Sequence, residues 1–395
     1  MIRRVDPLER LTAATRERTA AGLRRTLRPR EPGHFQSGTL DLASNDYLGL
    51  SRDPRLAEGA IEAVRTWGTG STGSRLVTGT TGLHTALEAR LAEFTCMPDA
   101  LVFSSGYLAN LGVLTALRPG LIVSDQGNHA SLIDGCRLAR CPVVVTPHRD
   151  VAAVDAALDG ARDAVVVTDA VFSVDGDLAP LRELHAVVRS RGALLVIDEA
   201  HALGVVGPGG RGAAYAAGLA GEPDVILTVT LSKSLASQGG AVLGAPQVIE
   251  TMVDTARSFV FDTGLAPASA GAAAAALDVL AAEPALAERA RDRARRLAGI
   301  ADALGLETTS PAAAVVPVII GDPHDAVRAA EICSGYDVRV GCFRPPSVPY
   351  GRACLRLTAR ASLDEAELTT VTRALTGVKE QIGPYSARNA EATRR

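Results

Sequence analysis

One lysine lies in a segment that suits covalent chemistry. The apolar residues 225–229 lead into Thr230-Leu-Ser-Lys233, and Gln238-Gly-Gly240 follows. A lysine at the end of a buried strand loses solvation, which lowers its pKa and frees its amine to condense with an aldehyde. The hydroxyls of Thr230 and Ser232 can bind a phosphate without adding charge. An exposed loop lysine is the competing reading of this segment alone, so the assignment depends on residues elsewhere.

A carboxylate follows a second apolar run. Residues 194–197 are apolar, Asp198 comes next, and His201 stands three residues later. Ligands of α/β sheets bind at the carboxyl ends of strands, and a buried carboxylate needs a positive partner. A protonated pyridine nitrogen is such a partner, and its charge makes the ring an electron sink. His201 can reach the phenolic oxygen of that ring. Asp198 alone can also be a helix N-cap, but with Lys233 it predicts pyridoxal 5′-phosphate (PLP) held as a Schiff base.

Three further segments end strands in the same way. Gly106 and Tyr107 follow a strand and open a helix, where backbone amides can bind a phosphate. His129, in Asn128-His-Ala-Ser131, can stack on a flat ring, although a lone histidine is more often structural. Ser173, in Val171-Phe-Ser-Val-Asp-Gly176, can contact the same ring. The expected convergence of these candidates at one sheet edge is stronger evidence for a cofactor site than any single motif.

The chain alternates short β-branched runs with Ala/Leu-rich helical segments, which predicts an α/β fold with a mostly parallel, seven-stranded sheet between helices. The strands are expected at residues 100–103, 121–124, 143–146, 164–168, 194–197, 225–229 and 240–243. A smaller α+β unit should have strands near 314–320, 338–340 and 354–358 and a last helix at 363–375. We therefore expect an N-terminal helical segment (1–40, helix at 7–27), a large cofactor-binding domain (41–283), a small C-terminal domain (284–380) and a loose tail (381–395).

Composition excludes several classes of protein. With 395 residues and a formal net charge of −3, the chain lacks the basic balance of a nucleic-acid binder. Its six cysteines show no metal-binding spacing, so no metal site is expected, and they are read as reduced thiols. The chain shows no signal segment and no apolar run long enough for a membrane span, which predicts a cytoplasmic protein.

These motifs, in this order, resemble the α-oxoamine synthase family of PLP-dependent enzymes, which has fold type I. The resemblance covers roughly residues 20 to 375. It is carried by the following segments: Ser44-Asn-Asp-Tyr-Leu-Gly-Leu50, Ser105-Gly-Tyr107, Asn128-His-Ala-Ser131, Val171-Phe-Ser-Val-Asp-Gly176, Asp198-Glu-Ala-His201, Thr230-Leu-Ser-Lys233 and Phe343-Arg-Pro-Pro-Ser-Val-Pro349. Within the family, the match favours the member of biotin biosynthesis that condenses L-alanine with a pimeloyl thioester, carried on coenzyme A (CoA) or acyl carrier protein (ACP).

The resemblance also implies residue roles. Lys233, Asp198 and His129 would be catalytic, with Asp198 pairing the pyridine nitrogen and His129 stacking on the ring and lining the substrate site. Arg344 would bind the amino-acid carboxylate, a task that suits a guanidinium, and Ser347 stands in place of a threonine. The other implied contacts are as follows: Gly106, Tyr107, Ser173, His201, Thr230, Ser232 and Thr263 to the cofactor, and Arg24 and Asn45 to the acyl substrate. Thr263 would reach the phosphate of a neighbouring subunit, so a homodimer is expected.

Two positions depart from the family pattern, because Ala202 and Ala236 stand where glycine is usual. No proposed chemical group is lost, so the departures bear on rate and substrate fit. Other readings remain open: another α-oxoamine synthase (glycine C-acetyltransferase, 5-aminolevulinate synthase or serine palmitoyltransferase), an aminotransferase or decarboxylase on the same fold, or a non-catalytic relative. The motifs do not settle the amino acid or the acyl carrier.

Overall fold

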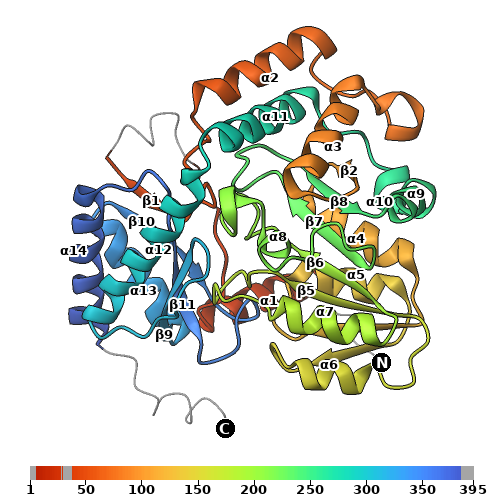
Figure 1. Ribbon diagram of the computed structural model, residues 1–395. Helices are drawn as coiled ribbons and strands as arrows, with labels where there is room; N and C mark the ends of the chain where they lie inside the picture. Colours follow the sequence, from red (N-terminus) through yellow and green to blue (C-terminus); the bar gives the residue numbers. More distant parts are fainter. Residues whose placement is uncertain (1–5, 28, 30–37, 384–395) are drawn as a thin grey trace.

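A seven-stranded sheet forms the centre of the larger part of the molecule (Figure 1). The computed structural model describes residues 6–27, 29 and 38–383. The strand order is β2-β8-β7-β6-β5-β3-β4, and only the pairs of β8 with β2 and β7 are antiparallel. The strands are β2 (Asp99–Phe103), β3 (Leu121–Asp125), β4 (Val143–Thr146), β5 (Ala164–Asp169), β6 (Leu194–Asp198), β7 (Val225–Thr230) and β8 (Gly240–Gly244). All seven lie within one residue of their expected bounds, which confirms the predicted sheet.

Both faces of this sheet are buried except at the edge strand β4, where Val143, Val144 and Val145 are exposed. Along β5, Val165 and Val167 pack into one hydrophobic cluster and Val166 into another. Helices α4 (Gly106–Leu117), α5 (Ala130–Ala139) and α9 (Pro246–Thr255) contribute to the first cluster. Helices α3 (Gly82–Thr95), α7 (Leu181–Ser190) and α11 (Pro267–Ala282) contribute to the second. Because the strands other than β4 are buried on both faces, they read as continuous apolar runs, which is why they could be predicted.

The smaller sheet has the order β1-β10-β11-β9. Strands β9 (Val315–Gly321), β10 (Val338–Phe343) and β11 (Ala353–Thr358) were expected, and helices α12 (Ala285–Ala303), α13 (Pro323–Gly335) and α14 (Glu365–Ile382) accompany them. Strand β1 (Leu40–Leu42) was not expected, and it pairs in parallel with β10. The expected domain boundary at residue 41 cuts β1, so the chain enters the smaller sheet before it builds the larger one.

The terminal helices differ from the prediction. Helix α1 (Pro7–Ala20) ends well before residue 27, because Gly22 adopts a left-handed φ of +66° and stops the helix. Helix α14 continues beyond residue 375 to Ile382, since a capping box at Asp364 and Glu367 starts it and Gly383 ends it with a φ of +82°. The expected tail therefore begins inside a helix, and its residues 384–395 lie outside the described part of the chain.

Two general expectations can be compared with the structure. All six cysteines are free thiols. Among the described residues, no single helix is long and apolar enough to cross a membrane, and α11 and α12 meet that test only as a pair joined by an 86° bend.

Candidate active site

Lys233 lies in a tight turn directly after β7. The Ala236 amide donates to the Lys233 carbonyl over 2.9 Å, and the Ser237 amide donates to the Leu231 carbonyl over 2.9 Å. The lysine is half-buried. Burial lowers the pKa of its amine to about 8, and the negative charge of Asp198 opposes this shift. A substantial fraction of the amine is therefore neutral near pH 8 and can act as a nucleophile.

Asp198 ends β6 and is held by a polar network. Asn110 Nδ2 donates to Asp198 Oδ2 over 2.7 Å and to Ser131 Oγ over 2.8 Å. Ser131 Oγ lies 2.7 Å from His129 Nδ1, and Thr228 Oγ1 donates to Asn110 Oδ1 over 2.6 Å. One chain of hydrogen bonds therefore joins Asp198 to His129. Sequence reasoning gave Asn110 no role, although it stands one helical turn after Gly106 on α4.

His129 caps α5 beside a second buried acid. The His129 amide donates to Asp169 Oδ2 over 3.0 Å, and Asp169 pairs in register with Asp198 on the adjacent strand. Burial, followed by the nearby Asp198 charge, holds the pKa of Asp169 well above its usual range. His129 is exposed to solvent, yet the protein around it removes enough water to lower the pKa of the ring. Asp169 was missed, and its place at the end of β5 was the available signal.

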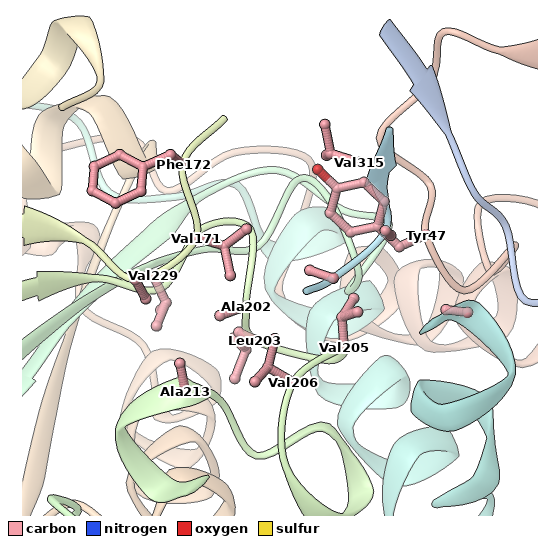
Figure 2. Packing of buried hydrophobic residues seen from close by; sticks show 14 of the residues in the cluster. Tyr47, Val171, Phe172, Ala202, Leu203, Val205, Val206, Ala213, Val229 and Val315 are labelled. Atoms are coloured by element: carbon pink, nitrogen blue, oxygen red, sulfur yellow. The ribbon is translucent and has the colours of Figure 1, made fainter. Parts of the chain in front are cut away.

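His201 forms a buried pair with Tyr47, whose hydroxyl lies 2.6 Å from His201 Nδ1. Burial, followed by the positive charges of Lys233 and Arg356, holds the pKa of His201 well below its usual value. The ring is therefore neutral. Figure 2 shows the ring of Tyr47 close to Val315. It also shows Ala202 within the hydrophobic cluster, where it is fully buried.

The start of α4, the end of β7 and the start of β8 come close together. A Cβ on Gly106 would lie 3.0 Å from Thr230 Cβ, and one on Gly240 would lie 2.4 Å from the Gly106 nitrogen. Thr230 Oγ1 lies 2.7 Å from Ser232 Oγ. The Gly106 and Tyr107 amides precede the first intrahelical hydrogen bonds, which makes this helix start an anion site. The side chain of Tyr107 is held by Asp134, so only its amide is available there.

Arg356 on β11 is a buried cation that sequence reasoning missed. Its Nη1 donates to the Ser173 carbonyl over 2.9 Å and its Nη2 to Asn45 Oδ1 over 2.7 Å. The guanidinium lies over the Phe343 ring, 4.5 Å from its centroid, and its Nε is buried with no hydrogen-bond partner. Its charge lowers the pKa values of Lys233 and His201. An arginine inside the apolar run Ala-Cys-Leu-Arg356-Leu-Thr was the signal that could have found it.

Two of the expected substrate residues, Arg344 and Ser347, line a second region, at the N-terminal segment. Arg344 donates to the backbone carbonyls of Gly22 and Arg24, the latter over 3.3 Å. Arg25 Nη2 donates to Ser347 Oγ over 3.2 Å. A cavity of about 250 Å³ is lined by Leu23, Arg25, Cys342, Phe343, Arg344, Pro345 and Ser347. The Arg24 side chain is exposed and is not among these residues, whereas Asn45 lies with Arg356 and Tyr47.

Thr263 lies in the segment that precedes α11. It is exposed, and it forms an isolated antiparallel bridge with Ser74. Its neighbour Asp262 is hydrogen-bonded to Ser104, two residues before the start of α4. The contact of Thr263 with the phosphate of another subunit stays a prediction.

A family comparison matches residues 37–375 of this chain to aminotransferase class I and II. The chain belongs to this family. Among class I and II relatives, the 8-amino-7-oxononanoate synthases of Mycolicibacterium vanbaalenii and Mycolicibacterium smegmatis are 58% and 59% identical to it. The match covers 95% of this chain in both cases and 98% and 97% of the relatives.

Solved structures of the family agree with the fold. A serine palmitoyltransferase from Sphingomonas wittichii is 30% identical, with a TM-score of 0.87, over 96% of this chain and 99% of its own. The 8-amino-7-oxononanoate synthase of Francisella tularensis is 25% identical, with a TM-score of 0.76, over 88% of this chain and 98% of its own. The predicted fold type I architecture and the resemblance to α-oxoamine synthases are confirmed.

The chemistry of the site fits PLP. The amine of Lys233, with its lowered pKa, and the Asp198 carboxylate interact electrostatically from adjacent strand ends. The α4 N-terminus lies against Thr230, where hydroxyls and amides can bind a phosphate. The neutral His201 ring and the exposed His129 belong to the same electrostatic cluster. An amine, an acid and an anion site are the three features that this cofactor requires.

Proposed function

We propose that this protein is a PLP-dependent acyltransferase of biotin biosynthesis. It condenses L-alanine with a pimeloyl thioester and releases 8-amino-7-oxononanoate, CO₂ and the free thiol carrier. The observation that carries the proposal is the Lys233–Asp198 pair at the ends of β7 and β6, in a chain 58–59% identical over nearly its full length to enzymes of that name.

Each group then has a chemical task. When bound, PLP supplies an electron sink for the negative charge that develops at the alanine Cα. Lys233 would hold the cofactor, and its amine, with a pKa of about 8, is suited to take and return the Cα proton. Asp198, fixed by Asn110, would keep the ring nitrogen protonated. His129 would stack on the ring beside Ser173, and His201 would contact its phenolic oxygen.

Two arginines are candidates for the alanine carboxylate. The family resemblance points to Arg344, which in this structure holds the N-terminal segment through backbone carbonyls. Arg356 has the stronger physical case, because it is buried, has an unpartnered Nε and influences Lys233 electrostatically. We propose that Arg356 binds the carboxylate. Arg344 would then close the cavity beside Ser347 and Arg25, where the acyl chain would lie.

The proposal extends to assembly and location. Thr263 would complete the phosphate site of a second copy, so the enzyme would be a homodimer, and it would act in the cytoplasm. The acyl carrier is CoA or ACP, and the product assay compares the two thioesters.

The test is a product assay. Purified holoenzyme is incubated with L-alanine and pimeloyl-CoA or pimeloyl-ACP, and products are identified by mass. Formation of 8-amino-7-oxononanoate with CO₂ release is expected for the wild type. The variant Lys233→Ala should lose both this activity and the visible absorbance of the lysine-bound cofactor. An unchanged absorbance spectrum in this variant would refute the lysine assignment.

A second α-oxoamine synthase activity has structural support, because the serine palmitoyltransferase of Sphingomonas wittichii has a TM-score of 0.87 with this chain. The same assay with serine, with glycine, and with palmitoyl-CoA or acetyl-CoA separates the two. A higher kcat/KM for serine with palmitoyl-CoA than for alanine with either pimeloyl thioester would select this alternative. Transfer of the amino group without a new C–C bond would instead identify an aminotransferase.

A further inference from the structure

His148 lies between two loops that flank the candidate site. It follows β4, and its Nδ1 is 3.0 Å from Asp125 Oδ1 while its Nε2 is 2.9 Å from Asp177 Oδ2. Asp125 ends β3 and begins the loop that leads to His129. Asp177 closes the turn that contains Ser173, where its carbonyl accepts the Phe172 amide over 3.0 Å. One imidazole therefore connects two segments that were both assigned to the cofactor.

The geometry fixes the charge of this ring. An ionised carboxylate can only accept hydrogen bonds, so both ring nitrogens of His148 must carry a proton, and the ring is a cation. The hydrogen bonds to Asp125 and then Asp177 raise the pKa of His148 to about 9, against the effect of burial. The other charged group at this position is Arg149, whose Nη1 lies 3.1 Å from Asp177 Oδ2 and whose amide donates to Asp125 Oδ2 over 2.7 Å. The Phe172 ring packs edge-on against the imidazole at 4.3 Å.

Each of the two loops is hydrogen-bonded to, or leads directly into, a residue of the site. Asp125 Oδ1 also accepts the Gly127 amide over 2.7 Å, two residues before His129. On the other side, the Ser173 carbonyl accepts from Arg356 Nη1. Loss of the two His148 hydrogen bonds would loosen the loop that precedes His129. It would also loosen the turn whose Ser173 carbonyl accepts a hydrogen bond from Arg356. The remaining hydrogen bond to Asn45 and the contact with the Phe343 ring would orient Arg356 less tightly.

We propose that His148 is a positioning residue, a cationic tether between Asp125 and Asp177 that fixes His129 and Arg356 for binding of the amino acid. The proposal rests on the function proposed above, because it takes an amino acid as the ligand of Arg356.

The test compares His148→Gln with His185→Gln. Glutamine is neutral and cannot donate to both carboxylates as the imidazolium does. His185 is the matched control, since it lies on α7 and is likewise paired with an aspartate, Asp224, over 3.0 Å. Alanine binding to the holoenzyme is followed through the visible absorbance of the cofactor. Amide hydrogen exchange of peptides covering 125–129 and 171–178 is measured in the same holoenzyme. His148→Gln should bind alanine about tenfold more weakly, the effect of losing roughly one charge-assisted hydrogen bond.

The expected exchange pattern is local. Peptides 125–129 and 171–178 should exchange faster in His148→Gln than in the wild type. In His185→Gln their exchange rates should equal those of the wild type. The wild type should lose alanine affinity relative to His148→Gln as the pH rises through about 9, where the imidazolium loses its proton. Asp177→Asn should weaken alanine binding in the same direction.

Two results would overturn the proposal. The first is alanine affinity in His148→Gln equal to that of His185→Gln. The second is faster exchange throughout the protein, which would make His148 a general stabilising residue. Neither readout uses the acyl thioester, so a wild type that binds alanine but forms no amino ketone would refute the proposed function alone.

Discussion

Replacement of Arg356 by lysine tests which arginine binds the substrate carboxylate. Lysine keeps the positive charge near Lys233 but lacks the planar fork that donates to Ser173 and Asn45 at once. Its single ammonium group has to serve these two acceptors and the substrate together. We therefore expect Arg356→Lys to lose at least one charge-assisted hydrogen bond to the bound carboxylate.

The magnitude follows from that loss. A hydrogen bond to a charged group contributes about 1.5–3 kcal/mol. Since about 1.4 kcal/mol corresponds to a tenfold change in affinity, alanine should bind roughly 10- to 100-fold more weakly. The matched control is Arg344→Lys, because Arg344 donates to backbone carbonyls of the N-terminal segment. In that variant the alanine affinity should change by less than about threefold.

The assay is a titration of each holoenzyme with L-alanine, followed by the visible absorbance of the cofactor. Thermal unfolding and cofactor content are measured alongside, to show that both variants are folded and loaded. The reasoning is wrong if Arg344→Lys weakens alanine binding tenfold or more while Arg356→Lys binds alanine like the wild type. That outcome would identify Arg344, which the family resemblance favoured, as the residue that binds the alanine carboxylate.

Three further predictions concern the alanine pair Ala236 and Ala202, then Asn110, then Lys233. Ala236 has a left-handed φ of +48°, so Ala236→Gly should raise the free energy of unfolding by about 1 kcal/mol. Ala202→Gly should lower it by a similar amount, because a buried methyl is lost. Urea unfolding measures both changes, and the same sign at the two sites would contradict the argument. Asn110→Ala should weaken PLP binding roughly tenfold, since Asp198 loses its side-chain donor and keeps the Ala200 amide, and unchanged affinity in a PLP titration would remove Asn110 from the site. As the pH rises from 8 to 10.5, the apoprotein should gain about 1–3 kcal/mol in the free energy of unfolding relative to Lys233→Met. Burial lowers the pKa of the Lys233 amine in the folded state, so the unfolded state binds more protons over this range. A difference between the two proteins that does not change with pH would show that the amine is not buried.

The sequence determined the sheet and the chemical groups at its edge. Six of the seven strands of the larger sheet were predicted because they are buried on both faces and read as continuous apolar runs. The edge strand β4 was predicted from its β-branched run, although its three valines are exposed. Asp198 and Thr230 end such runs, and Lys233 follows three residues later. A parallel sheet brings strand ends to one edge, so local patterns were sufficient to place these residues together.

Only the tertiary structure decided which distant side chains meet. Arg356 stands in an apolar strand that shows no local sign of facing Lys233, and its partner Asn45 is 311 residues away. Tyr47 and His201 are separated by 154 residues, and β1 pairs with a strand near the other end of the chain. Periodicity reports which face of an element is buried, because burial follows the local pattern of apolar residues. It does not report what packs against that face, since this contact depends on how the two sheets and the N-terminal segment come together.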